Sequence, residues 1–187
     1  MATVAGLVLA AGAGSRFGAP KALARTPDGE PWVARAVETL LAGGCREVVV
    51  VLGAAAAEAR ALVPPGAAVV VADGWAEGMA ASLAEGLAAM PPAEAALITL
   101  VDLPGLPSAV CRRLLESGVA PTVLRRAVYA GRPGHPVLLG ARHWHPFAAT
   151  LAGDRGGRAY LDAHGVEPVE CGDLFDGADV DRDAQRR

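Results

Sequence analysis

Apolar runs alternate with amphipathic segments over the first 116 residues. Four of these runs have the length of strands: residues 4–10, 47–52, 67–71 and 96–101. Such continuous runs are typical of parallel strands that helices cover on both faces. Between and after them, apolar positions recur at helical spacing over residues 32–41, 54–62, 79–90 and 108–116. This alternation predicts an α/β fold, a three-layer α/β/α domain with a doubly wound, mostly parallel sheet.

From residue 122 onward the pattern is less regular. After residues 122–129, the glycines and prolines of residues 131–136 predict a loop, followed by a short strand over 137–139. Residues 153–157 predict another loop, 158–164 a helix and 166–169 a strand, and the tail from Cys171 is acidic. Because no repeat or low-complexity linker interrupts the chain, we expect residues 1–187 to form one domain.

Composition narrows the class of protein. Hydrophobic residues make up 52% of the 187 positions but aromatic ones only 4%, so the core must consist mainly of Ala, Val and Leu. The net charge of −3 argues against a nucleic-acid surface, and phosphate binding would need local cations. The three cysteines are far apart and form no C-x-x-C pair, which indicates reduced thiols. With no export signal and no membrane-spanning stretch, we expect a soluble, cytoplasmic protein without a membrane partner.

The segment after the first predicted strand carries the clearest candidate chemistry. Residues 7–21 read L-V-L-A-A-G-A-G-S-R-F-G-A-P-K. The glycines let backbone N–H groups approach an anion, and Arg16 and Lys21 add positive charge, which predicts a triphosphate-binding loop. An ordinary glycine-rich turn is the simpler alternative. The spacing excludes a G-x-G-x-x-G fingerprint, because three residues separate Gly14 from Gly18, and it excludes a P-loop, because Lys21 follows a proline.

This segment resembles the signature of the nucleoside-triphosphate transferases, L-A-[AG]-G-x-[GS]-x-R-[FM]-G-x-P-K, at every defined position. Later segments are similar to those of the molybdenum cofactor cytidylyltransferases: E-G-M-A-A-S-L at 77–83, D-L-P at 102–104, G-H-P-V-L at 134–138 and G-D-R-G at 153–156. The resemblance runs nearly end to end. It implies a MobA-like NTP transferase domain with a Rossmann-like nucleotidyltransferase fold. The implied reaction transfers CMP from CTP to a molybdopterin-type cofactor and releases pyrophosphate.

The resemblance also implies where the nucleotide binds. The implied nucleotide-binding residues are Leu9, Ala10, Ala11, Gly12, Gly14, Arg16, Lys21, Gly78 and Ser82. Relatives that use cytosine read L-A-A-G where guanine users read L-A-G-G, so Ala11 favours cytosine. The family reads G-M-S-S-S-L where this chain reads G-M-A-A-S-L at 78–83, so Ala80 and Ala81 replace two serines and only the Ser82 hydroxyl remains. Lys21 is expected at the α-phosphate, where negative charge shifts during transfer.

The catalytic residues implied are Arg16, Lys21 and Asp102. Asp102 directly follows an apolar strand, and in the resembling family the equivalent aspartate binds Mg²⁺, an ion that prefers carboxylate and phosphate oxygens. The family's C-terminal D-[IV]-D-T-P-E-D supplies a second carboxylate. Here the tail reads D-V-D-R-D without Thr-Pro, so Asp181, or Asp179 behind it, is the candidate ligand. A solvated acidic tail is the alternative.

Residues of the second half are candidates for the acceptor. The resemblance implies that His135, between Gly134 and Pro136, faces the second substrate. Arg132 and Arg155 are further candidates for binding the acceptor, and Arg158 is a weaker candidate. The remaining histidines, at positions 143, 145 and 164, are expected at the surface. A molybdoenzyme or a chaperone is a candidate protein partner.

Three alternatives remain open at this point. The acceptor could be another small phosphorylated metabolite. Some proteins that resemble this branch reduce nicotine-derived pigments with NAD(P)H, although the missing dinucleotide fingerprint argues against that here. The altered tail also leaves room for a nucleotide-binding regulator without catalytic activity.

Overall fold

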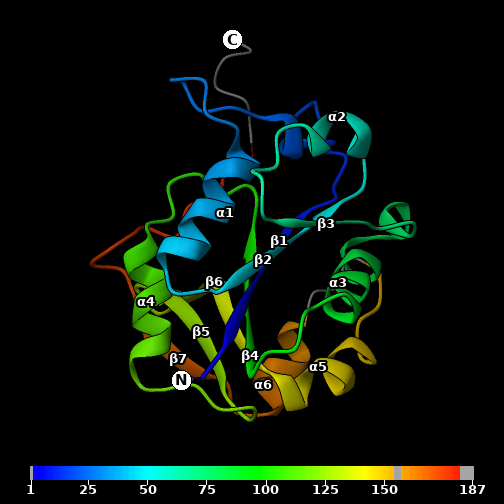
Figure 1. Cartoon of the computed structure of the whole chain (residues 1–187). Helices are drawn as coiled ribbons and strands as arrows, with labels where there is room; N and C mark the ends of the chain where they lie inside the picture. The colour runs from blue at the N-terminus through cyan, green and yellow to red at the C-terminus, as the bar shows by residue number, and fades with distance from the viewer. Residues whose placement is uncertain (1, 154–156, 182–187) are drawn as a thin grey trace.

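A seven-stranded sheet runs through the centre of the computed structural model, which describes residues 2–153 and 157–181 (Figure 1). The strand order is β3-β2-β1-β4-β6-β5-β7, and only the pairs that involve β6 are antiparallel. The strands are β1 Val4–Ala10, β2 Glu47–Leu52, β3 Ala68–Val71, β4 Ala95–Leu100, β5 Leu124–Tyr129, β6 Arg132–Gly140 and β7 Glu167–Glu170. The predicted α/β class with a mostly parallel sheet is confirmed.

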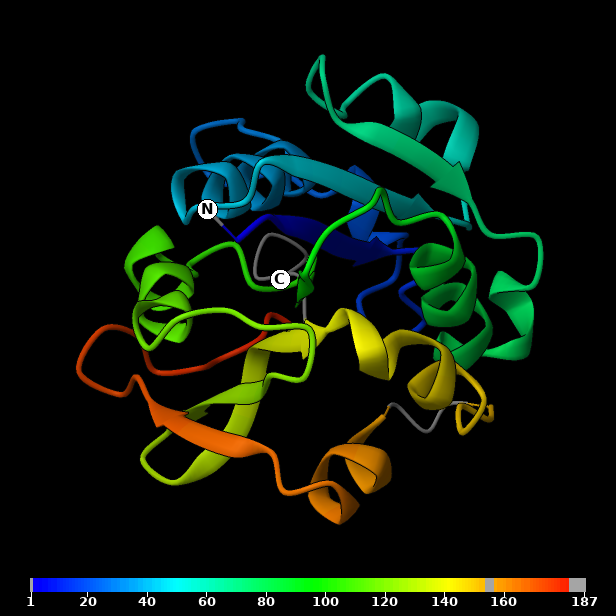
Figure 2. The same ribbon diagram turned by 60° about the horizontal axis from the view of Figure 1, so that its bottom comes forward.

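Helices cover both faces of the sheet (Figures 1 and 2). On one face lie α1 Trp32–Ala42 and α4 Ser108–Glu116, and on the other lie α3 Met79–Ala88, α5 Ala141–Ala148 and α6 Arg158–Ala163. The remaining helical elements are α2 Ala56–Arg60, η1 Lys21–Leu23 and η2 Trp75–Glu77. In the described ranges, no helix is both long enough and apolar enough to cross a membrane.

Alternate side chains of the central strands belong to two separate hydrophobic cores, one on each face of the sheet. Val8 of β1 belongs to the same core as Leu40 of α1 and Leu114 of α4, whereas Leu7 belongs to the core that contains Leu83 and Leu87 of α3. Every residue of β1 is buried, as expected for a parallel strand that lies between two other strands and two helical layers. The predicted ends differ from the observed ends mostly by one or two residues, with α2 shorter than expected.

The predicted loop over residues 131–136 is wrong. Residues 132–140 form β6, which lies antiparallel between β4 and β5, and the chain turns at Ala130 and Gly131 with φ of 50° and 75°. The Glu170 carboxylate accepts hydrogen bonds from both turn N–H groups. The prolines are tolerated because β4 pairs with β6 only from residue 137 onward. Helix α5 was not predicted, and it contains Pro146.

The acidic tail folds back over the sheet after β7. The Phe175 ring packs edge-on against Tyr129, with ring centroids 5.6 Å apart. Farther on, the Val180 N–H donates a hydrogen bond to the Asp102 carbonyl over 3.0 Å. The tail therefore ends its described course beside Asp102, the second residue after β4.

Candidate functional site

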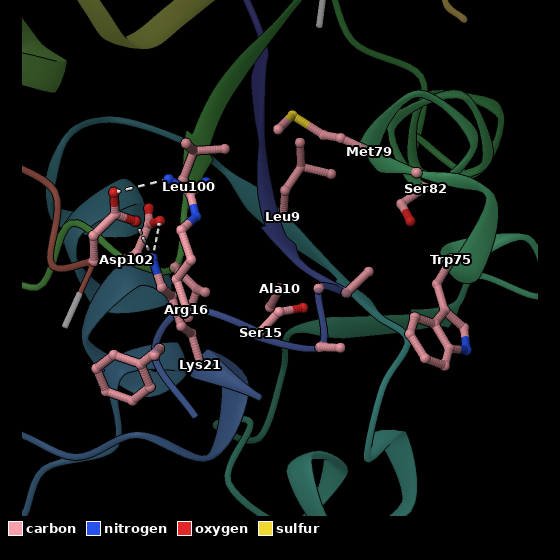
Figure 3. Close-up of a pocket in the computed structure, with 18 of the residues that line it drawn as sticks. Leu9, Ala10, Ser15, Arg16, Lys21, Trp75, Met79, Ser82, Leu100 and Asp102 are labelled. Carbon is pink, nitrogen blue, oxygen red and sulfur yellow. Dashed lines mark hydrogen bonds and ion pairs between the residues drawn. The ribbon is translucent and has the colours of Figure 1, made fainter. Parts of the chain in front are cut away.

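A pocket of about 560 Å³ opens at the carboxyl ends of β1 and β4. Ligands of open α/β sheets bind at this edge. Arg16, Lys21 and Asp102 lie at one end of the pocket, and Trp75 lies at the other (Figure 3). All nine predicted nucleotide-binding residues line it, as do Asp102 and Asp181. The structure thus brings these residues together, while their roles stay predictions.

The glycine-rich loop after β1 has a shape that depends on Gly14. This residue has a φ of 64°, and a Cβ atom added to it would lie 1.9 Å from the Ala19 carbonyl oxygen. The loop closes through a 2.7 Å hydrogen bond from the Gly18 N–H to the Gly14 carbonyl. The buried Phe17 ring anchors it against Trp32. A side chain at position 14 would force the loop open, so the sequence fixes the pocket wall locally.

Lys21 joins the loop to two aspartates from other parts of the chain. Its ammonium group lies 2.8 Å from Asp102 Oδ2 and 3.1 Å from Asp181 Oδ1. Burial lowers the pKa of Lys21, but the hydrogen bonds and charges of the two carboxylates outweigh this effect and raise the pKa above its ordinary value. The lysine is therefore a cation held between two anions. Arg16 lies farther out, 3.5 Å from Asp181 Oδ2, with a largely exposed side chain.

Three carboxylates form a cluster suited to a divalent cation. Oxygen atoms of Asp102, Asp179 and Asp181 all lie within 4.8 Å of one another. Asp102 Oδ1 is buried and has no hydrogen-bond partner among the described residues. Such an atom is costly unless it meets a cation or water, and hard cations prefer this donor set. The sequence favoured Asp181 over Asp179, and the structure brings both to Asp102.

The loop that carries Asp102 is anchored to α1. Arg35 Nε donates a hydrogen bond to the Pro104 carbonyl, and Arg35 Nη1 forms a 2.8 Å ion pair with Glu30. On the other side, the Val101 N–H donates to the Leu9 carbonyl over 3.1 Å. Sequence reasoning missed Arg35, because an arginine in an amphipathic helix gives no signal of the loop that it contacts.

The described residues predicted to bind the acceptor do not line the pocket, unlike those predicted to bind the nucleotide. His135 lies at the start of β6, and burial lowers the pKa of its imidazole, an effect that the charges of Asp102 and Asp179 partly oppose. Arg132 is exposed beside the β5–β6 turn, and neither residue lines the pocket. Arg155 lies outside the described residues. Arg158, the reserve candidate, is exposed and pairs with Asp162 at 3.5 Å.

Two of the three histidines expected at the surface, His145 and His164, are exposed. His143 is instead partly buried, and its Nδ1 lies 2.8 Å from the Tyr160 hydroxyl. The contact links α5 to α6. His143 is therefore part of the packing between these two helices.

Fold and pocket define an α/β protein with an acidic cluster beside a glycine-rich, basic loop at the carboxyl edge of its sheet. The sequence model of the MobA-like NTP transferase domain matches residues 6–169. The chain belongs to this family of nucleotidyltransferases.

Individual relatives cover almost the whole chain. Nicotine blue oxidoreductase of Paenarthrobacter nicotinovorans is 41% identical over 190 residues, which span 95% of this chain and 92% of that protein. The crystal structure of Rv0371c from Mycobacterium tuberculosis H37Rv is 30% identical, with a TM-score of 0.83 over 97% of this chain and 94% of the other. Rv0371c in complex with manganese matches at 27% identity and a TM-score of 0.74, over 90% and 88% of the chains.

Proposed function

We propose that the protein transfers CMP from CTP to a small phosphorylated acceptor, a molybdopterin-type cofactor, and releases pyrophosphate in a Mg²⁺-dependent reaction. The observation that carries this proposal is the meeting of Lys21 with the carboxylates of Asp102 and Asp181 at one end of the pocket. Cations that hold phosphates and carboxylates that hold a metal are the two parts that nucleotidyl transfer needs.

The residues present fit a divalent cation, which Asp102, Asp179 and Asp181 would hold. The complex of the related Rv0371c with manganese supports the binding of a divalent cation. When bound, Mg²⁺ neutralises phosphate charge. Lys21 would leave its carboxylate partners for the α-phosphate, and Arg16, exposed at the rim, would bind the outer phosphates. An acceptor phosphate oxygen then bonds to the α-phosphorus, while the bond to the bridging oxygen breaks and pyrophosphate leaves with that electron pair.

Base and acceptor rest on other residues. The proposed preference for cytosine rests on Ala11, which is buried and lines the pocket. His135, with Arg132 and Arg155, is the proposed acceptor side, and the effect of the Asp102 and Asp179 charges on the pKa of His135 supports its part in this assignment. The assignment of residues 1–187 to one such domain also stays a prediction, which the family match over residues 6–169 supports.

A second candidate function is an NAD(P)H-dependent reduction. The 41% identity to nicotine blue oxidoreductase favours it. The glycine spacing, which lacks the dinucleotide fingerprint, and the three clustered carboxylates, which would repel the phosphates of a dinucleotide in the absence of a metal, argue against it.

Thermal unfolding with a panel of ligands separates the two functions. CTP, GTP, ATP and NADPH are each added with and without Mg²⁺. CTP with Mg²⁺ should stabilise the protein most, by about 2.7 kcal/mol at 100 times its Kd. Equal shifts with all three triphosphates would refute the cytosine assignment. A response to NADPH alone, independent of Mg²⁺, would favour the reductase. Pyrophosphate release from CTP on addition of molybdopterin cofactor then tests the acceptor.

A further inference from the structure

An indole ring stands at the end of the pocket opposite the charged residues. Trp75, the first residue of η2, lines the pocket, and Figure 3 shows it far from Lys21 and Asp102. The residue is half-buried, so one part of the ring packs against protein while another faces the pocket. The exposed Met79 lies at the same end. This end therefore offers apolar and aromatic surface in place of charge.

The position of Trp75 depends on a glycine in the neighbouring loop. A Cβ atom at Gly53, directly after β2, would lie 2.5 Å from Trp75 Cβ, 2.7 Å from Trp75 Cγ and 2.6 Å from the Ala11 carbonyl oxygen. The indole therefore approaches the backbone at Gly53 closely, beside Ala11. Any side chain at position 53 would push the ring away from this place.

A carboxylate from α3 fixes the loop that carries the ring. Glu85 accepts hydrogen bonds from the N–H groups of Asp73, at 3.1 Å, and Gly74, at 3.0 Å, the two residues before Trp75. A carboxylate that accepts two adjacent backbone N–H groups holds a turn more rigidly than a neutral acceptor does. Glu85 does not line the pocket, so it can affect a ligand only through this loop.

We propose that Trp75 is the platform on which the base of the bound nucleotide stacks, and that Glu85 is a positioning residue for it. The inference rests on the proposed function in one respect, which is that the phosphates lie at Lys21 and the base at the other end. Stacking on an aromatic ring contributes about 1–3 kcal/mol per base and accepts any base, because every base has a π-face. Trp75 thus supplies affinity, while the choice of base lies with other groups.

Binding of CTP and of inorganic tripolyphosphate, both with Mg²⁺, tests the proposal by calorimetry. Tripolyphosphate occupies the charged end without a base. Trp75→Ala should weaken CTP binding roughly 5- to 150-fold, the equivalent of about 1–3 kcal/mol, and leave tripolyphosphate binding unchanged. Trp75→Phe, which keeps a ring, should recover most of the affinity. The change in tryptophan fluorescence on CTP binding should disappear in Trp75→Phe. It should persist in Trp144→Phe, because the Trp144 indole lies outside the pocket and donates a hydrogen bond to the Leu139 carbonyl.

Glu85→Gln tests the positioning residue. The amide can accept only one of the two N–H groups and would point a donor at the other, so CTP binding should weaken by less than in Trp75→Ala. Tripolyphosphate binding should again stay unchanged. Glu77→Gln is the matched control, because this exposed carboxylate on η2 holds neither N–H group and should bind both ligands as the wild type does.

The outcomes distinguish a failure of the role proposed for Trp75 from a failure of the proposed function. An equal loss of CTP and tripolyphosphate binding in Trp75→Ala would make Trp75 a packing residue, and unchanged CTP binding would exclude it from the site. Either result leaves the proposed function intact. If the wild type binds NADPH and not CTP, the proposed function is wrong, and the Trp75 and Glu85 variants are then measured with NADPH against the same expectations. If the wild type binds no nucleotide, both are wrong.

Discussion

The two ends of the pocket are built in different ways. At the charged end, side chains that are 81 and 160 positions apart in the sequence meet through ion pairs, Lys21 with Asp102 and Lys21 with Asp181. At the apolar end, Trp75 is held by backbone contacts to Gly53 and by the Glu85 hydrogen bonds of its own loop. One end consists of charges that can change partners, and the other consists of surfaces whose shape is fixed.

This difference separates two tasks. A transfer between phosphates needs positive charge beside the oxygen atoms on which negative charge develops. Lys21, which is paired with carboxylates, can exchange these anions for a phosphate. Recognition of a base needs a surface that does not move. We therefore expect variants at the charged end to change turnover strongly, and variants at the apolar end to change affinity with little effect on turnover.

The largest effect is expected from Asp102→Asn. The variant keeps the shape of the side chain and its hydrogen-bonding capacity but removes the charge of the most buried of the three clustered carboxylates. Pyrophosphate release from CTP and acceptor should fall by at least about 10³-fold, because a metal and its stabilisation of the transition state are lost together. Unchanged thermal unfolding without ligands serves as the control for folding.

Asp181→Asn should reduce turnover less than Asp102→Asn, because Asp179 remains as a third carboxylate within reach. Full Mg²⁺-dependent activity in both variants would place the metal elsewhere and remove the distinction between the two ends. Full activity in Asp181→Asn alone would leave the metal on Asp102 and Asp179.

A smaller loss of turnover than in Asp102→Asn is expected from Lys21→Met. Turnover should drop about 10²-fold, as when one donor that stabilises the charge of a transition state is removed. Without nucleotide, however, affinity for Mn²⁺ should rise, because the ammonium group that now neutralises Asp102 and Asp181 would be absent. Titration of free Mn²⁺ by electron paramagnetic resonance measures this affinity.

Arg25→Met is the matched control for Lys21→Met. Arg25 is an exposed cation that donates to the Gly29 carbonyl and has no contact with the carboxylates, so this variant should change neither quantity. A lower Mn²⁺ affinity in Lys21→Met would contradict competition between the lysine and the metal.

The sequence predicted those features that short segments determine by themselves. The loop over residues 12–21 could be recognised because Gly14 dictates its own backbone geometry, and β1 and β2 could be recognised because burial on both faces requires continuous apolar runs. The residues predicted to bind the nucleotide converge in one pocket because the ends of parallel strands share an edge of the sheet.

Features that depend on distant partners were missed or left open. Residues 131–136 contain the glycines and prolines of a loop, yet pairing of Arg132 and Pro133 with β5 makes residues 132–136 part of β6. The course of the tail depends on Tyr129 and on the Asp102 backbone, which no local pattern near Asp179 reveals. The position of the Trp75 ring likewise depends on Gly53, which belongs to a different loop.

The smallest effect is expected from Ser82→Ala at the apolar end. Ser82 is buried at the first turns of α3, lines the pocket, and follows two alanines that stand where the family has serines. A neutral hydrogen bond contributes about 0.5–1.5 kcal/mol, so Kd for CTP should rise only about 2- to 12-fold, with kcat within a factor of about two. Ser108→Ala, at the start of α4 and outside the pocket, is the matched control. A collapse of kcat in Ser82→Ala would show that this hydroxyl acts on the reacting phosphates, and the assignment of turnover to the charged end alone would then be wrong.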